Sequence, residues 1–310
     1  MLWTAIASAQ QYPVRPVRIV VPYAAGGLPD TMGRLVAQRL TEGFGQQFII
    51  DNRPGAGGIG ACELVARAAA DGYTLLVADV SQTAINLALY SKLPYDTLRD
   101  FAPVSIIGTS AQFLTVHASV PASTLTELIA LARAKPGQMR YGSSGIGSLH
   151  HLGMEVLKSA LGLDIVHVPY KGTAQSIPAL LGGEVSIAFA ALPSIVQHIK
   201  TGRVKLLAVN TLKRSSQAPD VPTVAEVTGI ADFDYPPLIG VLAPAGTPRA
   251  TVARIAAGIA TAVRHPEVVQ RFGVLGIDPV GSTPEAYAAQ TRLDIERYAG
   301  AVKASGAKVE

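Results

Sequence analysis

The chain alternates short apolar runs with longer segments of helical periodicity, and this alternation constrains its fold more than any other feature. The runs Val17–Tyr23 ("VRIVVPY") and Thr74–Ala78 ("TLLVA") are typical of strands. Between such runs, the segment "TLTELIALARAKPG" places apolar residues at helical spacing and stops at Pro136 and Gly137. Strands that alternate with helices predict an α/β protein whose parallel sheets carry helices on both faces.

Two breaks divide this alternation into two lobes. One lies near His117–Pro121, and the other is the proline-rich stretch Pro219–Pro237. A chain of 310 residues that is 49% hydrophobic can bury two cores. We therefore expect one lobe in residues 12–117 plus 238–310. The other lobe and the hinge crossings are expected in 118–237, with a cleft between the lobes.

The opening residues, "MLWTAIASAQQ", are interpreted as the remnant of a signal peptide at 1–11. The apolar stretch leads to Ala7-Ser8-Ala9, which has the pattern of a cleavage site. This segment predicts an exported protein. The single cysteine, Cys62, excludes an internal disulfide and a cysteine metal cluster.

The charge balance favours small anions over nucleic acid. The net charge is +4, the basic residues are scattered, and aromatic residues make up only 6% of the chain. Nucleic-acid binding calls for a basic stripe with stacking side chains, and neither is present in the sequence. A mild positive field attracts anionic small molecules instead.

One glycine pattern points to a different function. Gly55, Gly57 and Gly60 spell G-x-G-x-x-G between a strand and a helix, and Asp79 follows the next strand. This arrangement is typical of a dinucleotide site and keeps an NAD-dependent enzyme as an alternative. Four residues, "DNRP", separate the apolar run at 48–50 from the first glycine, which favours an ordinary glycine-rich turn.

Three other segments share a design that suits anions. In 20–34, 140–152 and 168–181, a strand is followed by small residues and then by a helix. Each such helix N-terminus offers unpaired backbone N–H groups and the positive end of the helix dipole. Small residues let a ligand approach the backbone closely. Three such loops in two lobes predict a binding site for an organic anion.

Catalytic patterns are weak by comparison. His151 and Glu155 lie one helical turn apart, but no third metal ligand is evident, so neither metal nor cofactor is expected. A hydrolase or lyase built on Ser148 and His150 is an alternative that would require turnover. We expect a binding protein rather than an enzyme.

Long stretches of the sequence resemble one known family. They include "DNRPGAGGIGACELVARAAADGYTLLVAD", "YGSSGIGSLHHL", "VHVPYKGTAQSIPALLGGEVSIAF" and "LAPAGTP", and the similarity extends from Tyr12 to Gly306. These stretches resemble the Bug family, the periplasmic substrate-binding proteins of tripartite tricarboxylate transporters. The resemblance implies a type II-like Venus-flytrap fold, in which two lobes, each a mainly parallel sheet flanked by helices, close over a small organic anion. It also implies that the glycine-rich segment 53–60 is a structural loop.

The resemblance further implies a set of binding residues. Family members hold a ligand carboxylate with backbone groups and ordered waters from two loops, which correspond here to 23–30 and 142–148. In the first lobe this implies Tyr23, Ala24, Gly27 and Asp30, with Ser81 and Thr83 nearby. In the second lobe it implies Ser143, Ser144, Gly145, Ser148, Lys171, Gly172 and Ala190.

Four departures from the family pattern suggest the kind of ligand. Other residues stand where the family commonly has prolines, asparagine, aspartate and tryptophan, and together they make the cleft less polar and roomier: Ala24-Ala25, Ile146, Ala190-Ala191 and Pro237-Leu238. We expect a mono- or dicarboxylate with an apolar or aromatic body, rather than citrate or an amino acid. The chain would act as a monomer that serves the membrane subunits of a transporter. A ligand-sensing partner of a membrane kinase is an alternative that the sequence does not separate from transport.

Overall fold

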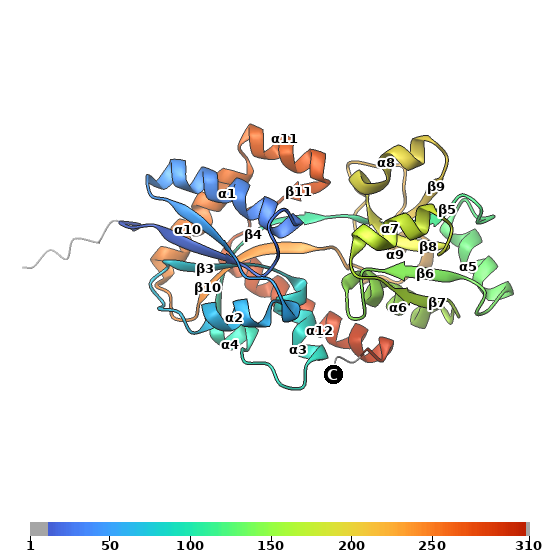
Figure 1. Ribbon diagram of the computed structural model, residues 1–310, viewed down its shortest axis with the longest axis horizontal. Coiled ribbons are helices and arrows are strands. Elements are labelled where there is room, and N and C mark those ends of the chain that lie inside the picture. The colour runs from blue at the N-terminus through green and yellow to red at the C-terminus, as the bar shows by residue number, and fades with distance from the viewer. Residues whose placement is uncertain (1–11, 308–310) are drawn as a thin grey trace, which may run out of the picture.

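A computed structural model describes residues 12–307, which form two α/β lobes lying side by side (Figure 1). Each lobe is built around one sheet, with six strands in the first lobe and five in the second. Helices flank both sheets, so the predicted two-lobe α/β architecture is confirmed. The interpretation of residues 1–11 as a signal-peptide remnant lies outside the described residues.

The first lobe combines segments from both ends of the chain. Its strands, in the sheet order β11-β4-β10-β3-β1-β2, are Ile277–Pro279, Phe101–Ser110, Leu238–Pro244, Thr74–Asp79, Val17–Val21 and Phe48–Asn52. Its helices are α1 (Leu28–Phe44), α2 (Ile59–Ala66), α3 (Asn86–Leu89), α4 (Thr97–Asp100), α10 (Arg249–Val263), α11 (Pro266–Leu275) and α12 (Pro284–Ser305). Two short turns complete it: a 3-10 turn, η1 (Ala56–Gly58), and a π-helical turn, η2 (Ser81–Ile85).

The second lobe is one continuous stretch of chain. Its strands, in the sheet order β7-β6-β8-β5-β9, are Val166–Pro169, Arg140–Ser143, Ile187–Ala191, Gln112–His117 and Val204–Val209. Its helices are α5 (Leu125–Ala134), α6 (Leu149–Leu161), α7 (Thr173–Leu181), α8 (Leu192–Lys200) and α9 (Val224–Thr228).

Local chemistry sets the helix ends. Pro29 lies in the first turn of α1, where its missing N–H is not needed. The same helix ends at Gly45, whose left-handed φ of 68° lets its N–H reach the carbonyl of Thr41 at 3.0 Å. The helix α5 begins at Thr124, whose hydroxyl accepts the N–H of Glu127. These are the boundaries that glycine, proline and threonine predict from the sequence.

Both sheets are mixed, which corrects the expectation of mainly parallel sheets. In the first sheet β1 pairs parallel with β2 and β3, whereas β10 pairs antiparallel with β3 and β4, and β11 with β4. In the second sheet β5 pairs antiparallel with both β8 and β9. The reason lies in the crossings, because β4 and β5 carry the chain out of the first lobe while β9 and β10 bring it back. Outgoing and returning strands that pair with each other must run in opposite directions.

The first crossing lies earlier in the chain than expected. The strand β4 ends at Ser110 in the first sheet, and β5 begins at Gln112 in the second. Residues 112–117, which were expected in the first lobe, therefore belong to the second. The return crossing runs from the end of β9 at Val209 to the start of β10 at Leu238 and includes α9.

The long helix α12 joins the two lobes. It follows β11 in the first lobe, yet it packs against α6 of the second lobe as well as against η2 and β4 (Figure 1). Tyr287 and Tyr298 on this helix are each 1% exposed. The ring of Tyr298 meets that of Tyr235, in the return crossing, edge to face at 5.5 Å. One apolar cluster, with members such as Leu76 and Leu114, accordingly extends through both lobes.

Candidate binding site between the lobes

A cavity of about 380 Å³ lies where the two lobes meet. The first lobe lines it with the end of β1, the glycine-rich loop after β2, and the turn η2 with α3. The second lobe lines it with the loop that precedes α6. Of the residues predicted from the sequence, four contribute to this lining: Tyr23, Ala24, Ser81 and Ser148.

The first binding loop, 23–30, is held in shape by Asp30. One carboxylate oxygen of Asp30 accepts the N–H of Gly26 at 2.8 Å and Arg34 Nε at 3.0 Å, and the other accepts Asn52 Nδ2 at 2.8 Å. Burial raises the pKa of Asp30, but the hydrogen bonds from Arg34, Gly26 and Asn52 outweigh it and hold the pKa below its usual value. The carboxylate is 2% exposed and fully engaged, so Asp30 shapes the loop and does not face a ligand. This corrects its predicted role as a contact residue.

The loop leads into a helix whose N-terminus has no side-chain cap. Gly27 is the N-cap of the 17-residue helix α1 and has no side chain to cap it, while Asp30 in the first turn accepts the N–H of Gly26, just before the helix. Ala24 is exposed and Gly27 is half-buried, so the backbone here is accessible. The N–H groups of this turn and the helix dipole favour a negative group.

A hydrogen-bonded triad forms one side of the cavity. The hydroxyl of Tyr23 donates to Asp79 Oδ2 at 2.6 Å, and Gln82 Nε2 donates to the Tyr23 hydroxyl at 3.1 Å. The other oxygen of Asp79 accepts the N–H of Ser81 at 2.7 Å. Burial raises the pKa of Asp79 and, together with the neighbouring Asp79 carboxylate, also the pKa of Tyr23. Asp79 thus anchors the start of η2, as expected of a residue at a strand end.

The glycine-rich loop does not have the geometry of a dinucleotide site. Gly57 and Gly58 are left-handed, with φ of 64° and 81°, and a Cβ on Gly58 would lie 2.7 Å from Pro22. The carbonyl of Gly57 accepts Gln82 Nε2 at 3.2 Å and Asn86 Nδ2 at 3.1 Å. The loop is therefore tied to the turn η2 rather than open toward a pyrophosphate. It is a structural loop, as the resemblance implies, but it also forms a wall of the cavity, which the sequence did not predict.

Two imidazoles brace the binding loop of the second lobe. His167 Nε2 lies 2.6 Å from the hydroxyl of Ser143, and His150 Nδ1 lies 2.8 Å from the hydroxyl of Ser144. The Ser143 hydroxyl also accepts the N–H of Gly145 at 3.1 Å. Burial lowers the pKa of both His150 and His167 to about 4, so both are neutral at pH 7.

A third imidazole holds the end of the same loop. His151 Nδ1 accepts the N–H of Gly147 at 3.1 Å, and its ring stacks on that of His167 at 4.2 Å. His167 in turn stacks on Tyr141 at 4.7 Å. Ser148 caps α6 through its hydroxyl, which accepts the N–H of His151 at 3.3 Å. The stacked rings of His151, His167 and Tyr141 thereby hold the loop in place.

The loop around Lys171 lies beside the second-lobe binding loop, residues 142–148, which we call the serine loop. The N–H of Tyr170 donates to the carbonyl of Ser143 at 3.1 Å, and the N–H of Gly172 donates to that of Ser144 at 3.2 Å. Gly172 has a φ of 96° and begins α7 without a side-chain cap. Lys171 is exposed. The structure therefore brings together the second-lobe residues that the sequence suggested, apart from Ala190.

Three predicted contact residues are buried away from the cavity. Thr83 is 3% exposed and donates its hydroxyl to the carbonyl of Asp79. Ser143 and Ala190 are each 1% exposed, the first engaged by His167 and the second packed in the sheet at β8. Their side chains do not present a surface to a ligand, because strand and turn geometry directs them inward. Ser143 supports the loop instead.

The sequence analysis missed several residues that line the cavity. Gln82, Asn86 and Tyr90 come from η2, α3 and the residue after α3, and Gly55 and Ala56 come from the glycine-rich loop. The polar pair Gln82 and Asn86, four residues apart after a buried strand, was the available signal.

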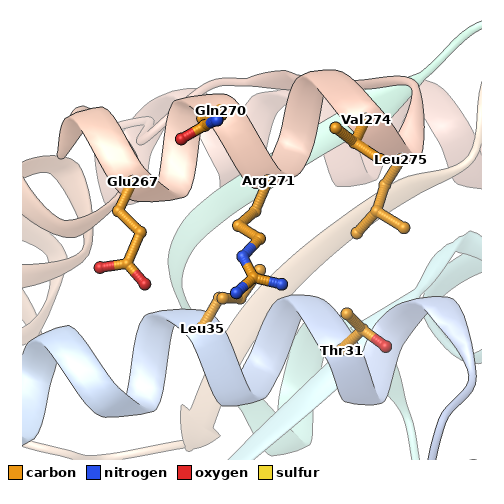
Figure 2. A pocket seen from close by; sticks show the side chains of 7 residues that line it. All are labelled: Thr31, Leu35, Glu267, Gln270, Arg271, Val274 and Leu275. Atoms are coloured by element: carbon orange, nitrogen blue, oxygen red, sulfur yellow. The ribbon is translucent and has the colours of Figure 1, made fainter.

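Another hollow lies outside the cleft. Figure 2 shows it between α1 and α11, with Arg271 reaching from α11 toward Leu35 of α1. Its volume is about 490 Å³, and every lining residue belongs to the first lobe. Glu267 at its rim is already paired with Arg39. A hollow confined to one lobe cannot enclose a ligand by lobe closure, so it is not the candidate site.

The residues considered for metal or acid–base chemistry are engaged in structural contacts. Glu155 Oε1 accepts the Tyr141 hydroxyl at 2.5 Å and Lys158 Nζ at 2.6 Å, while His151 faces Gly147. The hydroxyl of Ser148 caps its helix rather than meeting His150. Among residues 12–307 no cluster of three or more histidine, cysteine or acidic side chains is placed to hold a metal ion. Nor is any helix in this range long and apolar enough to cross a membrane.

Two α/β lobes with a shared cavity and uncapped helix N-termini define the class of two-lobe solute-binding proteins. Within this class, the chain belongs to the tripartite tricarboxylate transporter family receptor (TctC) family, whose profile matches residues 32–306. It is similar to BugT of Bordetella pertussis, with 36% identity over 307 residues, 99% of this chain and 94% of that protein. A protein of Pseudomonas sp. strain P51, described as the UPF0065 protein in the tcbD-tcbE intergenic region, is 36% identical over 93% of this chain and 85% of its own length. The resemblance to the Bug family is therefore confirmed.

Solved structures of similar proteins share the whole fold. The R. palustris protein Rpa4515 with adipate matches with a TM-score of 0.81 and 34% identity, covering 96% of this chain and 100% of that one. MatC from Rhodopseudomonas palustris, with bound malate, matches with a TM-score of 0.76 and 31% identity over 94% of this chain and 100% of its own. The periplasmic binding protein BugD matches at 0.77 and 30%, over 96% and 100%. This chain has the fold and function class of these periplasmic solute-binding proteins, and nothing in these matches supports an NAD-dependent enzyme.

Proposed function

We propose that this protein is a periplasmic receptor that captures an aliphatic dicarboxylate with an apolar body between its lobes. The observation that carries the proposal is that this cavity has the first binding loop of one lobe on one side and the serine loop of the other lobe on the opposite side. A ligand that spans this cavity contacts both lobes at once. Lobe closure would then bury it.

Each lobe offers a group suited to one carboxylate. In the first lobe this is the uncapped N-terminus of α1 at Gly27. In the second it is the N-terminus of α7 at Gly172, which is tethered to Ser144. Both sites present backbone N–H groups at the positive end of a helix dipole. Two such positions on opposite lobes fit a ligand with two carboxylates better than a ligand with one.

The lining of the cavity itself supports an apolar ligand body. Ile85, Leu89 and Ile146 line it, and Ile146 is 57% exposed. Tyr90 adds an aromatic ring to the same lining. A ligand hydroxyl group, such as the one on citrate, would face these side chains without a hydrogen-bond partner, at a cost of about 1–3 kcal/mol. Adipate, the ligand named for one related structure, has four methylene groups between its carboxylates and fits this description.

Binding without turnover is part of the proposal. The histidines near the cavity are neutral and engaged with loop hydroxyls and amides, and Ser148 caps a helix. No residue in the described cavity lining pairs a nucleophile with a general base. The protein would deliver its ligand to the membrane subunits of a tripartite tricarboxylate transporter and would act as a monomer.

A thermal-shift screen tests the proposal. The purified protein is heated with adipate, malate, citrate, an aromatic dicarboxylate and NAD in separate wells. A ligand at about 100 times its Kd adds roughly 2.7 kcal/mol of stability, which raises the midpoint by several degrees. We expect the largest shift with adipate and none with NAD. A shift with citrate alone would refute the apolar preference, and a shift with NAD alone would refute the receptor function.

A matched pair of variants tests the apolar wall. Ile146→Asn replaces an exposed cavity side chain with a polar one and should reduce the shift with adipate while increasing that with malate. Leu98→Asn makes the same type of change at a side chain that is 52% exposed on α4, outside the cavity. It should leave the ligand preference unchanged. Equal effects of the two substitutions would place the ligand elsewhere.

A further inference from the structure

A chain of hydrogen bonds leads from the serine loop to the first crossing between the lobes. The hydroxyl of Ser144 lies 2.8 Å from His150 Nδ1, and His150 Nε2 lies 3.3 Å from Gln112 Oε1. Gln112 is the first residue of β5, directly after the crossing from β4. A single imidazole therefore connects the binding loop with the hinge.

At Gln112 this series of hydrogen bonds reaches both crossings. The N–H of Gln112 donates to Asn210 Oδ1 at 2.9 Å, and the N–H of Asn210 donates to the carbonyl of Gln112 at 3.0 Å. Asn210 follows β9, and its side-chain amide donates to the carbonyl of Tyr235 in the return crossing at 2.7 Å. Gln112 and Asn210 are 4% and 3% exposed. The second-lobe ends of the two crossings are thus joined at the residue that His150 contacts.

The partners of His150 fix its proton. Burial lowers its pKa to about 4, so the ring is neutral at pH 7 and carries one donor and one acceptor. Gln112 Oε1 only accepts, which assigns the proton to Nε2. Nδ1 must then accept, and its donor is the hydroxyl of Ser144. In this arrangement the hydroxyl proton of Ser144 is used within the protein.

A ligand carboxylate at Ser144 would reverse this polarity. A carboxylate only accepts, so Ser144 can donate to it and keep its bond with His150 only if the ring proton moves from Nε2 to Nδ1, which then donates to the hydroxyl oxygen. The neutral ring then has a bare Nε2, which faces Gln112 Oε1 as a second acceptor. The contact is relieved when the amide of Gln112 turns over and presents its N–H groups. That rearrangement takes place among the buried groups that join the two crossings.

We propose that His150 is a positioning residue that transmits carboxylate occupancy at Ser144 to the hinge at Gln112 and so couples ligand binding to lobe closure. This inference rests on the proposed function and deepens it, because it assigns the step that links capture to closure. The ring does not need to touch the ligand for this role. It acts through the hydroxyl on one side and the amide on the other.

The test measures closure and affinity separately. Small-angle X-ray scattering gives the radius of gyration with and without saturating adipate, or malate if adipate does not bind, and calorimetry gives the Kd. His150→Asn keeps an amide near the Nδ1 position and removes the contact with Gln112. We expect this substitution to raise the Kd about 5- to 150-fold. Even at saturation, the radius of gyration of the variant should decrease less than that of the unmodified protein.

A second histidine provides the matched control. His167→Gln alters an imidazole that holds the neighbouring hydroxyl of Ser143 and for which the described residues show no bond to the hinge. It should weaken binding yet contract fully once saturated. Gln112→Met removes the amide that ends this series of hydrogen bonds at the hinge and should reproduce the incomplete contraction. It keeps the inference testable if His150→Asn does not fold.

The outcomes separate the two proposals. If the unmodified protein binds and contracts, and both His150→Asn and Gln112→Met contract equally at saturation, the relay is refuted while the receptor function stands. If the unmodified protein binds no carboxylate, the receptor function fails and the relay fails with it.

Discussion

Replacing Gly147 with alanine should destabilise the contact between the two lobes. Gly147 lies in the serine loop with a φ of 75°, and a Cβ there would lie 2.5 Å from Leu89 Cδ1 on α3 of the first lobe. The left-handed backbone alone costs an alanine about 1–2 kcal/mol. Overpacking against Leu89 adds roughly 1–3 kcal/mol. Gly147→Ala should therefore lower the free energy of unfolding by about 2–5 kcal/mol.

The chain offers a matched control for the backbone part of this cost. Gly162 caps the far end of α6 with a φ of 62°, and a Cβ there meets nothing within 4 Å. Gly162→Ala should lose only about 1–2 kcal/mol. Urea unfolding measures both values. In a double-mutant cycle, Leu89→Ala should recover about 1–3 kcal/mol in the Gly147→Ala background, since it removes the clash. Equal losses in the two glycine variants, or no coupling with Leu89, would refute the inter-lobe contact.

Three further predictions concern stability and the glycine motif. Burial raises the pKa of Asp294 on α12 to about 6, so the folded state holds a proton that the unfolded state releases near pH 4. The contribution of Asp294 to the free energy of unfolding is full below pH 4 and is lost as pH rises through 6. Denaturant titrations should therefore show the stability of the protein, relative to that of Asp294→Asn, falling by roughly 3 kcal/mol over that interval. A stability difference that does not change with pH would contradict this. Tyr23→Phe leaves Asp79 Oδ2 without its 2.6 Å donor and should lower the free energy of unfolding by about 1–3 kcal/mol, with no loss expected if the pairing is absent in solution. Gly60→Ala should leave the free energy of unfolding unchanged or raise it by up to about 1 kcal/mol, because Gly60 is helical and exposed with open space around it. Gly58→Ala should instead lower the free energy of unfolding by several kcal/mol. A large loss of stability in Gly60→Ala would contradict the open space around Gly60.

Much of the fold could be predicted because its signals are local. The strand–loop–helix segments at 20–34, 140–152 and 168–181 appear in the structure as β1-α1, β6-α6 and β7-α7. Each depends on an apolar run, small residues and a helical period within one short stretch. The crossing at residue 111 was placed a few residues too late, because β4 and β5 follow each other with no turn signal between them.

The antiparallel pairings could not be predicted in the same way. The strand β10 inserts between β3 and β4, with Val241 opposite Val77 and Ser105. An apolar run such as "LIGVLAP" specifies a buried strand but neither its neighbours nor its direction. The small strand β11 was missed because it is only three residues long.

The candidate site was predicted in outline and corrected in detail. The first binding loop and the serine loop were identified, whereas the glycine-rich wall was not, and Asp30, Thr83, Ser143 and Ala190 turn out to be buried. Short polar residues favour loop tips in general, and the sequence does not say which of them bond to their own loop. The links of Tyr23 with Asp79 and of Ser144 with His150 depend on tertiary packing, which no local pattern encodes.

The helix α12 has a consequence for how the molecule assembles. Its buried face meets η2 and β4 in the first lobe and α6 in the second, which are far from it along the chain. The central pairings of β10 with β3 and β4 likewise join distant segments. Such high contact order slows folding, because the entropy of closing long loops must be lost before these contacts form. The folding of the two lobes is therefore coupled through α12, and deletion of α12 would expose the apolar surfaces that it covers on both lobes.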